Sequence, residues 1–219
     1  MQAVKSDKKI MTKCLLFDCD GTLVDSERLC NVGLVIKFQE FGIQLDADEL
    51  VIRFRGWKLA KILGILSYEH KITLSNNFVP EYRAIVSGLF ETDLKPIKGI
   101  KTALDKLPYP KAVVSSGPVQ KIEQALRVCG LYDYFRGSIY SSYDIGIWKP
   151  DPRIYEYAAK DMGFSVCECA VVDDGPVGVE AGVKAGMKTF FYNRFNEECS
   201  FSKAISFYAM EELPSLIHA

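Results

Sequence analysis

The sequence has little of what marks membrane proteins, secreted proteins and zinc enzymes. No apolar run reaches the roughly 18 residues that a membrane-spanning helix needs. Residues 1–13 carry several lysines but no apolar stretch, so we expect no secretory signal there. The two histidines, His70 and His218, lie far apart and form no zinc-ligand pattern. A net charge of −1 indicates neither a nucleic-acid nor a membrane partner.

Cysteines are odd in number and irregularly spaced, which argues against a disulfide framework. The seven are Cys14, Cys19, Cys30, Cys129, Cys167, Cys169 and Cys199. Cys167 and Cys169 are one residue apart, but no second cysteine pair or nearby histidine would complete a metal site. We therefore expect reduced thiols that serve packing, and a cytoplasmic protein.

The chain has 219 residues, 48% of them hydrophobic, which suffices for one core and a small second lobe. Short apolar runs predict buried parallel strands, and helical patterns lie between them. Strands are predicted just before Asp18, at 111–116, 169–174 and 188–192, and more weakly at 205–208. Helices are predicted at 119–129, 152–162 and 178–185. This alternation predicts an α/β fold with a Rossmann-like, doubly wound parallel sheet.

Residues 26–94, which we call the helical insert, show helical patterns and no clear strand signal. Ser26 is a candidate N-cap for the first helix, and Asp46 with Glu49 forms a capping-box pattern before the second. Helices are predicted at 27–41, from about 47, at 58–68 and at 77–90. An insertion at the tip of the first strand would cover the ligand crevice as a lid. The predicted domains are an α/β core of residues 1–25 and 95–219 and an α-helical cap of residues 26–94.

Polar side chains gather where the predicted strands end. Asp18 and Asp20 follow the first strand, and the remaining elements are Ser115-Ser116-Gly117, Lys149 and Asp173-Asp174. The carboxyl ends of parallel strands meet at one edge of a sheet, where α/β proteins bind ligands. Four carboxylates beside one lysine need more positive charge, and Mg²⁺, which prefers oxygen ligands, would supply it. With the metal present, such a site can accept a phosphate dianion.

The same residue types suit phosphoryl transfer. One aspartate beside Mg²⁺ can attack phosphorus and form an aspartyl-phosphate. The second aspartate can protonate the leaving oxygen and then activate water. The Ser115 hydroxyl and the backbone amides of Ser116 and Gly117, near a helix start, make a plausible oxyanion cradle.

Together and in this order, the motifs resemble the haloacid dehalogenase superfamily of phosphohydrolases. The resemblance covers the chain from about Cys14 to the C-terminus. The helical insert is similar to the small α-helical cap found in β-phosphoglucomutase and phosphoglycolate phosphatase. The motifs that carry the resemblance are Asp18-Cys19-Asp20-Gly21-Thr22, Ser115, Lys149-Pro150-Asp151-Pro152, and Asp173-Asp174 leading into Gly178-Val179-Glu180-Ala181-Gly182.

The resemblance implies a role for each matched residue in the chemistry. Asp18 would be the nucleophile and a Mg²⁺ ligand. Asp20 would be the general acid/base and would bind the ion through its backbone carbonyl. Ser115 would hydrogen-bond the transferring phosphoryl group, and Lys149 would neutralise charge on Asp18 and on the phosphate.

The resemblance also implies metal and substrate contacts. Asp174 would be a direct ligand of Mg²⁺, and Asp173 would act through water. Within the superfamily, the chain is similar to bacterial 6-phosphogluconate phosphatases, which implies a sugar or sugar-acid phosphate as substrate. Arg55 and Lys58 in the helical insert would then reach a second anionic centre on the substrate, or they are solvated surface residues. Glu27 would contact the substrate or serve the first turn of its helix.

Other activities are possible on the same pattern. A β-phosphoglucomutase-type mutase is the nearest alternative, but Cys30 and Leu59 stand where such mutases carry a histidine and an arginine. Asp20 argues against a haloalkanoate dehalogenase, and the order of the motifs argues against a phospho-receiver module. A catalytically silent phospho-ligand binding protein is a further alternative. The expected partner is a small phosphorylated metabolite, with no nucleic acid and no membrane, and the chain is expected to be a monomer or weak dimer.

Overall fold

The computed structural model describes residues 11–196, 198 and 201–219. Within these residues, six strands form a parallel sheet in the order β3-β2-β1-β4-β5-β6. The strands are β1 (Cys14–Phe17), β2 (Lys111–Ser115), β3 (Ile139–Ser141), β4 (Cys169–Asp173), β5 (Lys188–Tyr192) and β6 (Ala204–Phe207). Because β1 lies between β2 and β4, the strand order reverses beside it, and the ligand crevice is expected outside the carboxyl ends of these strands.

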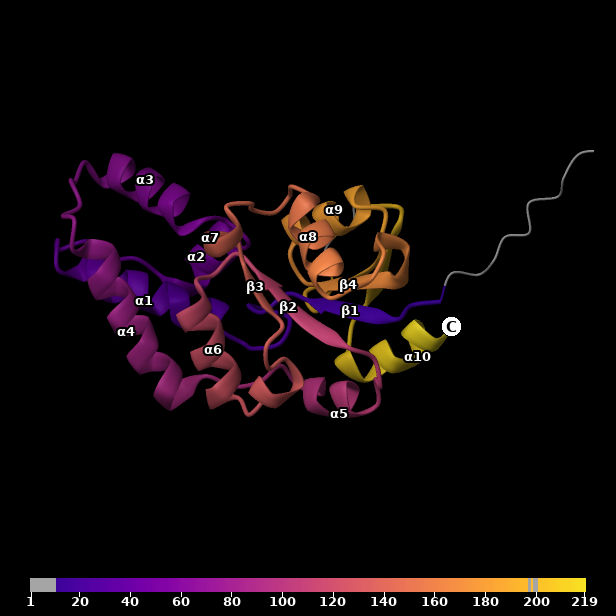
Figure 1. The fold of residues 1–219 in the computed structure, drawn as a ribbon. Coiled ribbons are helices and arrows are strands. Elements are labelled where there is room, and N and C mark those ends of the chain that lie inside the picture. Colours follow the sequence, from indigo (N-terminus) through magenta and orange to yellow (C-terminus); the bar gives the residue numbers. More distant parts are fainter. Residues whose placement is uncertain (1–10, 197, 199–200) are drawn as a thin grey trace, which may run out of the picture.

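Helices cover both faces of the sheet. Outside the helical insert they are α5 (Ile100–Asp105), α6 (Val119–Val128), α7 (Ser142–Ile145), α8 (Arg153–Asp161), α9 (Pro176–Lys184) and α10 (Leu213–His218), with 3-10 turns at Tyr132–Tyr134, Val166–Glu168 and Met210–Glu212. Successive strand residues point to opposite faces. In β1, Phe17 therefore packs with residues of α5, α6 and α10, whereas Leu16 packs with residues of α8 and α9. Figure 1 shows α8 and α9 on the opposite side of the sheet from α5 and α10.

The predicted fold class is confirmed, and the differences from the predicted elements are local. Strand β3 was not predicted, because three residues ending in serine give no apolar run. The six-residue helices α5 and α10 also escaped prediction, since they span less than two turns. Helix α9 begins at Pro176, two residues before the predicted start, because proline fits the first turn of a helix.

The helical insert contains a helix in each predicted stretch. They are α1 (Glu27–Gln39), α2 (Ala47–Phe54), α3 (Leu59–His70) and α4 (Phe78–Asp93). The Asp46 carboxylate caps α2 by accepting hydrogen bonds from the amides of Asp48 and Glu49, both at 2.9 Å. Ser26 stands at the N-cap position of α1, as predicted, but its hydroxyl donates to Asp20 and makes no capping hydrogen bond.

Helices α1 and α4 hold the insert together. The rings of Phe38 and Phe78 meet edge to face, with centroids 5.6 Å apart. The buried ammonium of Lys37 binds Glu40 at 2.5 Å and Glu81 of α4 at 2.7 Å. Figure 1 shows α1–α4 together at one end of the sheet, with α10 at the other end.

The remaining sequence-wide expectations concern cysteines and membranes. The six cysteines in the described part of the chain are free thiols, and Cys199 lies outside it. Among the described residues, no helix is both long enough and apolar enough to cross a bilayer.

Candidate active site

Three aspartates meet at the carboxyl ends of β1 and β4. Asp18 follows β1, Asp173 ends β4 and Asp174 comes next. One carboxylate oxygen from each lies within 4.8 Å of the other two, and all three residues are largely buried. The structure therefore brings together, in a group that could hold a metal ion, the two acidic motifs that lie far apart in the sequence.

Lys149 lies between two of these carboxylates. Its ammonium donates to Asp18 Oδ1 at 2.5 Å and to Asp173 Oδ2 at 2.7 Å. Asp173 also accepts hydrogen bonds from the Tyr155 hydroxyl and the Gly175 amide, both at 2.8 Å. The Asp173 carboxylate is therefore held by protein donors on both oxygens. Tyr155 was missed in the sequence, where its only signal is its place in the helix after the Lys149 motif.

Asp174 has fewer protein donors than Asp173. The Thr22 hydroxyl donates to Asp174 Oδ1 at 2.9 Å, and the Asp174 amide donates back to the same hydroxyl at 3.0 Å. A Cβ at Gly21 would come within 2.2 Å of Asp174 Oδ2, and the φ of Gly21 is +81°. Only glycine allows this turn to pass so close to the carboxylate.

The buried acids are short of positive charge. Burial raises the pKa of Asp18 to about 7, and the charges of Asp173 and Asp20 add to this while Lys149 opposes it. Burial and the charges of Glu27, Asp173 and Asp18 hold the pKa of Asp174 well above its ordinary value. A divalent cation would relieve this repulsion, and an all-oxygen donor set is the kind that Mg²⁺ prefers. The residues therefore fit the predicted Mg²⁺.

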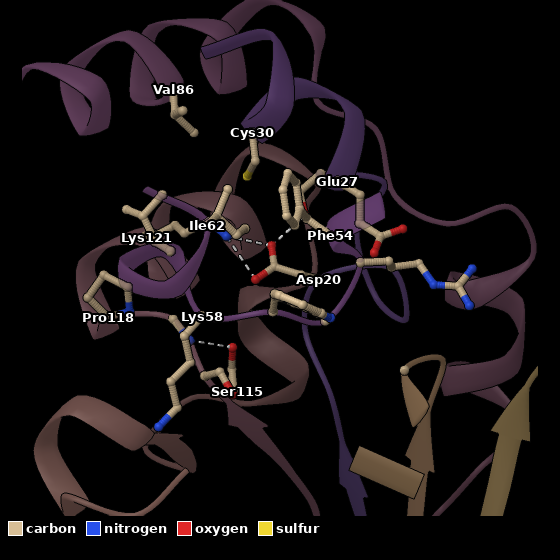
Figure 2. A pocket seen from close by; sticks show the side chains of 18 of the residues that line it. Asp20, Glu27, Cys30, Phe54, Lys58, Ile62, Val86, Ser115, Pro118 and Lys121 are labelled. Carbon is tan, nitrogen blue, oxygen red and sulfur yellow. Dashed lines mark hydrogen bonds and ion pairs between the residues drawn. The ribbon is translucent and has the colours of Figure 1, made fainter. Parts of the chain in front are cut away.

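Asp20 lies in a different environment from the other acids. Lys121 of α6 donates to Asp20 Oδ1 at 2.7 Å and to Oδ2 at 2.8 Å (Figure 2). The buried Ser26 hydroxyl also donates to Oδ1. Burial alone would raise the pKa of Asp20, but the Lys121 charge and these hydrogen bonds bring it below its ordinary value. The carboxylate of Asp20 is thus turned to Lys121 and lies outside the three-aspartate cluster.

The Ser115 motif forms another wall of the site. Ser115 ends β2, and its hydroxyl accepts a hydrogen bond from the Gly117 amide at 3.1 Å. The Gly117 carbonyl accepts a hydrogen bond from Ser141 at the end of β3, at 2.7 Å. Ser115, Ser116 and Gly117 all line the same cavity as Asp18. The predicted cradle residues therefore share a cavity with the acidic cluster, with the Gly117 amide engaged by the Ser115 hydroxyl.

The cavity has a volume of about 590 Å³ and lies between the strand ends and the helical insert. The core contributes the polar residues described above. The insert contributes mainly apolar side chains, among them Val51, Phe54, Leu59, Ile62, Val86 and Phe90. A molecule in the cavity would therefore meet charge at one end and apolar surface at the other.

The three predicted substrate contacts from the insert face different neighbours. The Arg55 guanidinium lies 4.8 Å from the centroid of the Phe195 ring, whereas the Lys58 ammonium lies 4.3 Å from that of Trp148. Figure 2 shows Lys58 directed away from Asp20. Glu27 forms an ion pair with Arg194 at 3.1 Å. All three line the cavity, but each is engaged with a neighbour.

Comparison with known proteins agrees with this geometry. A sequence profile of the haloacid dehalogenase-like hydrolases matches residues 12–186. The chain is 40% identical over 207 residues to 6-phosphogluconate phosphatase of Escherichia coli strain K12, covering 93% of this chain and 94% of the relative. It is 28% identical over 184 residues to validoxylamine A 7'-phosphate phosphatase of Streptomyces hygroscopicus subsp. limoneus, covering 81% and 84%.

A solved structure has a similar fold. It is that of a conserved haloacid dehalogenase-like protein of unknown function from Agrobacterium tumefaciens, with a TM-score of 0.78 and 28% identity, and the match covers 94% of this chain and 98% of that one. Both curated relatives are named as phosphatases, which supports the predicted class of enzyme. The resemblance predicted from the motifs is confirmed: the chain belongs to the haloacid dehalogenase-like hydrolase family.

Proposed function

We propose that this hydrolase is a Mg²⁺-dependent phosphatase that acts on a small phosphorylated metabolite through an aspartyl-phosphate on Asp18. A sugar or sugar-acid phosphate, such as 6-phosphogluconate, is the proposed substrate class. The observation that carries this proposal is the meeting of Asp18, Lys149 and the Asp173–Asp174 pair on one cavity wall, with Ser115 on the next.

The metal would be held by Asp18, Asp174 and the backbone carbonyl of Asp20. Asp173 would contact it through a water molecule. When bound, Mg²⁺ would supply positive charge where the substrate phosphate and the buried carboxylates repel each other. Asp173 is suited to a supporting role, because three protein donors already hold its two oxygens.

The protein groups divide the reaction into two displacements on phosphorus. Asp18 attacks the phosphoryl group, the bond to the leaving oxygen breaks, and Asp20, in its protonated form, gives its proton to that oxygen and becomes a carboxylate. Asp20 then takes a proton from water as the water oxygen attacks phosphorus and the Asp18 carboxylate leaves. Lys149 offsets charge on Asp18 and on the phosphoryl oxygens, and the Ser115 hydroxyl and the Ser116 amide bind those oxygens. The Gly117 amide would join them by exchanging its hydrogen bond to the Ser115 hydroxyl for one to a phosphoryl oxygen.

The helical insert is proposed to act as a cap that selects the substrate. Residues 26–94 would form this domain on a core of residues 1–25 and 95–219. Arg55 and Lys58 would bind a carboxylate on the substrate by exchanging their aromatic contacts for it, and Glu27 would bind a hydroxyl. All the named groups belong to one chain, so a monomer or weak dimer would carry complete sites.

The test is turnover of a panel of phosphorylated metabolites that includes 6-phosphogluconate, with release of inorganic phosphate as the readout. We expect hydrolysis with Mg²⁺, none after chelation, and a preference for sugar or sugar-acid phosphates. An isomerised sugar phosphate without phosphate release would identify a mutase instead. Ligand binding without turnover by any panel member would identify a silent binding protein.

A further inference from the structure

Three lysines of the described residues line the cavity, and of these Lys58 and Lys149 have a part in the proposed function whereas Lys121 has none. It stands third in α6, the helix that follows the Ser115 cradle. Its ammonium binds both oxygens of Asp20 from the far side of the cavity, at 2.7 and 2.8 Å (Figure 2). A lysine that spans two carboxylate oxygens restrains the rotation of that carboxylate, which a single hydrogen bond does not.

This location is unfavourable for a lysine without a compensating partner. A cation in the first turn of a helix opposes the helix dipole, and the Lys121 side chain is only 26% exposed. Its other near neighbours are the Phe90 ring, with the ammonium 5.8 Å from the centroid, and the Cys30 and Tyr82 side chains. Among the described residues, Asp20 is the carboxylate to which Lys121 is bound.

Asp20 is therefore held by two donors from different elements of the fold. Lys121 comes from the core helix α6, and Ser26 comes from the residue before α1 of the insert. Ser26 is fully buried and reaches only Oδ1, so without Lys121 the second oxygen of Asp20 loses its restraint. Because Asp20 already binds the Lys121 ammonium through both oxygens, that ammonium is poorly placed to bind a substrate anion at the same time.

We propose that Lys121 is a positioning residue that, with Ser26, holds Asp20 for its action as a base in the second half of the reaction. This inference rests on the proposed phosphatase mechanism. In that step the water oxygen bonds to phosphorus, the bond from phosphorus to Asp18 breaks, and the water proton passes to Asp20. A freely rotating Asp20 would meet the water less often, so the phosphorylated enzyme would persist.

The test separates the two half-reactions with p-nitrophenyl phosphate, whose leaving group departs without a proton from Asp20. With this substrate, formation of the phosphoenzyme does not depend on Asp20, whereas hydrolysis of the phosphoenzyme does. For Lys121→Met we expect kcat to fall about 10- to 100-fold, with kcat/KM within about threefold of wild type. This fall is at or below the lower end of the roughly 10²- to 10⁴-fold that proton transfer contributes, because Asp20 itself is retained. A burst of nitrophenolate and a phosphoenzyme that can be trapped on quenching should accompany the fall.

Matched variants show whether Lys121 acts through Asp20. In an Asp20→Asn background, Lys121→Met should cause no further loss, because the group it positions is already disabled. Lys121→Arg should restore most of kcat, since a guanidinium can also bind both oxygens. Arg127→Met, which removes a cation from the exposed face of the same helix, should leave the kinetics unchanged.

Ser26→Ala keeps the proposal testable if Lys121→Met fails to fold, and it should show the same burst with a smaller fall in kcat. A raised KM with unchanged kcat would show that Lys121 binds substrate and would overturn the proposal. Equal losses in kcat and kcat/KM without a burst, or a further loss in the Asp20→Asn background, would also overturn it. A wild-type enzyme without Mg²⁺-dependent turnover would instead contradict the proposed function itself.

Discussion

The two walls of the cavity hold their charged groups in different ways. The core wall is formed by the residues at the strand ends, and the insert wall by residues 26–94. On the core wall, Lys149 binds Asp18 and Asp173 at 2.5 and 2.7 Å, and all three are largely buried. On the insert wall, Arg55 and Lys58 lie in a partly exposed segment and rest on aromatic rings of the core at 4.8 and 4.3 Å. The strand ends therefore hold their charged groups by buried ion pairs, whereas the insert cations rest on aromatic rings.

Asp18 is the residue whose replacement should have the largest effect on activity. Asp18→Asn keeps the shape of the side chain but removes the nucleophile, so turnover of any phosphate ester should fall by about 10⁴-fold or more. Circular dichroism and Tm should show an intact fold, because the amide is isosteric and Lys149 keeps Asp173 as a partner. Wild-type turnover by this variant would show that the proposed mechanism is wrong.

Replacing Lys149 should have the second-largest effect on the core wall. Lys149→Ala leaves Asp18 and Asp173 buried without their shared cation, which should cost about 3 kcal/mol of unfolding free energy at neutral pH. Loss of charge stabilisation in the transition state should lower kcat about 10²- to 10³-fold. Denaturant unfolding and kcat at saturating Mg²⁺ measure the two effects. Lys188→Ala removes a lysine at the opposite end of the sheet and should leave kcat unchanged.

The core wall could be predicted from the sequence because its chemistry lies in short contiguous motifs. A buried strand can be read from a run such as residues 15–17, and the acids that follow it must then meet at the sheet edge. Asp18, Ser115, Lys149 and the Asp173–Asp174 pair all line one cavity for that reason.

The groups that escaped prediction act through side chains that reach across the fold. The sequence predicts an N-cap at Ser26, because serine is favoured at the position before a helix. Nothing in the sequence says that its hydroxyl is close to Asp20. Lys121 carried one signal that could have been used, namely a lysine in the first turn of a helix, where the helix dipole disfavours it.

The shortage of positive charge on the core wall predicts how Mg²⁺ binding depends on pH. The pKa of Asp18 rises from its ordinary 3.8 to about 7 in the metal-free fold, and that of Asp174 is also raised. A raised carboxyl pKa means that the folded state holds protons more tightly than the unfolded state. The metal-free protein therefore loses stability as pH rises from about 4 to 7 through Asp18, and Mg²⁺ should restore it.

The measurement is the Tm with and without Mg²⁺ across this range. The rise in Tm caused by saturating Mg²⁺ should be larger at pH 8 than at pH 5.5. Apparent Mg²⁺ affinity should fall about tenfold per pH unit below 7 for each proton that binding displaces. The same Mg²⁺-induced shift at both pH values would show that Asp18 is not a titrating ligand, and Asp18→Asn should flatten the dependence.

The insert wall should give the smallest effects, and they should depend on the substrate. If Arg55 and Lys58 bind a substrate carboxylate, replacing either by methionine should raise KM for a sugar-acid phosphate about tenfold, the size of one charge-assisted hydrogen bond. The value of kcat should stay within about twofold, because the proposed reaction gives neither cation a part in the chemical steps. Turnover of p-nitrophenyl phosphate, which has no carboxylate, should be unaffected.

Lys61 provides the matched control, because it lies in α3, the helix that follows Lys58, and does not line the cavity. Like Lys58 it rests on a tryptophan, with its ammonium 3.7 Å from the centroid of the Trp57 ring. Lys61→Met should therefore leave KM unchanged for both substrates. If Arg55→Met and Lys58→Met raise KM equally for the sugar-acid phosphate and for the matching neutral sugar phosphate, the two cations do not read a carboxylate. In that case they serve to hold the insert against Phe195 and Trp148, and selection between substrates falls to the apolar face of the insert.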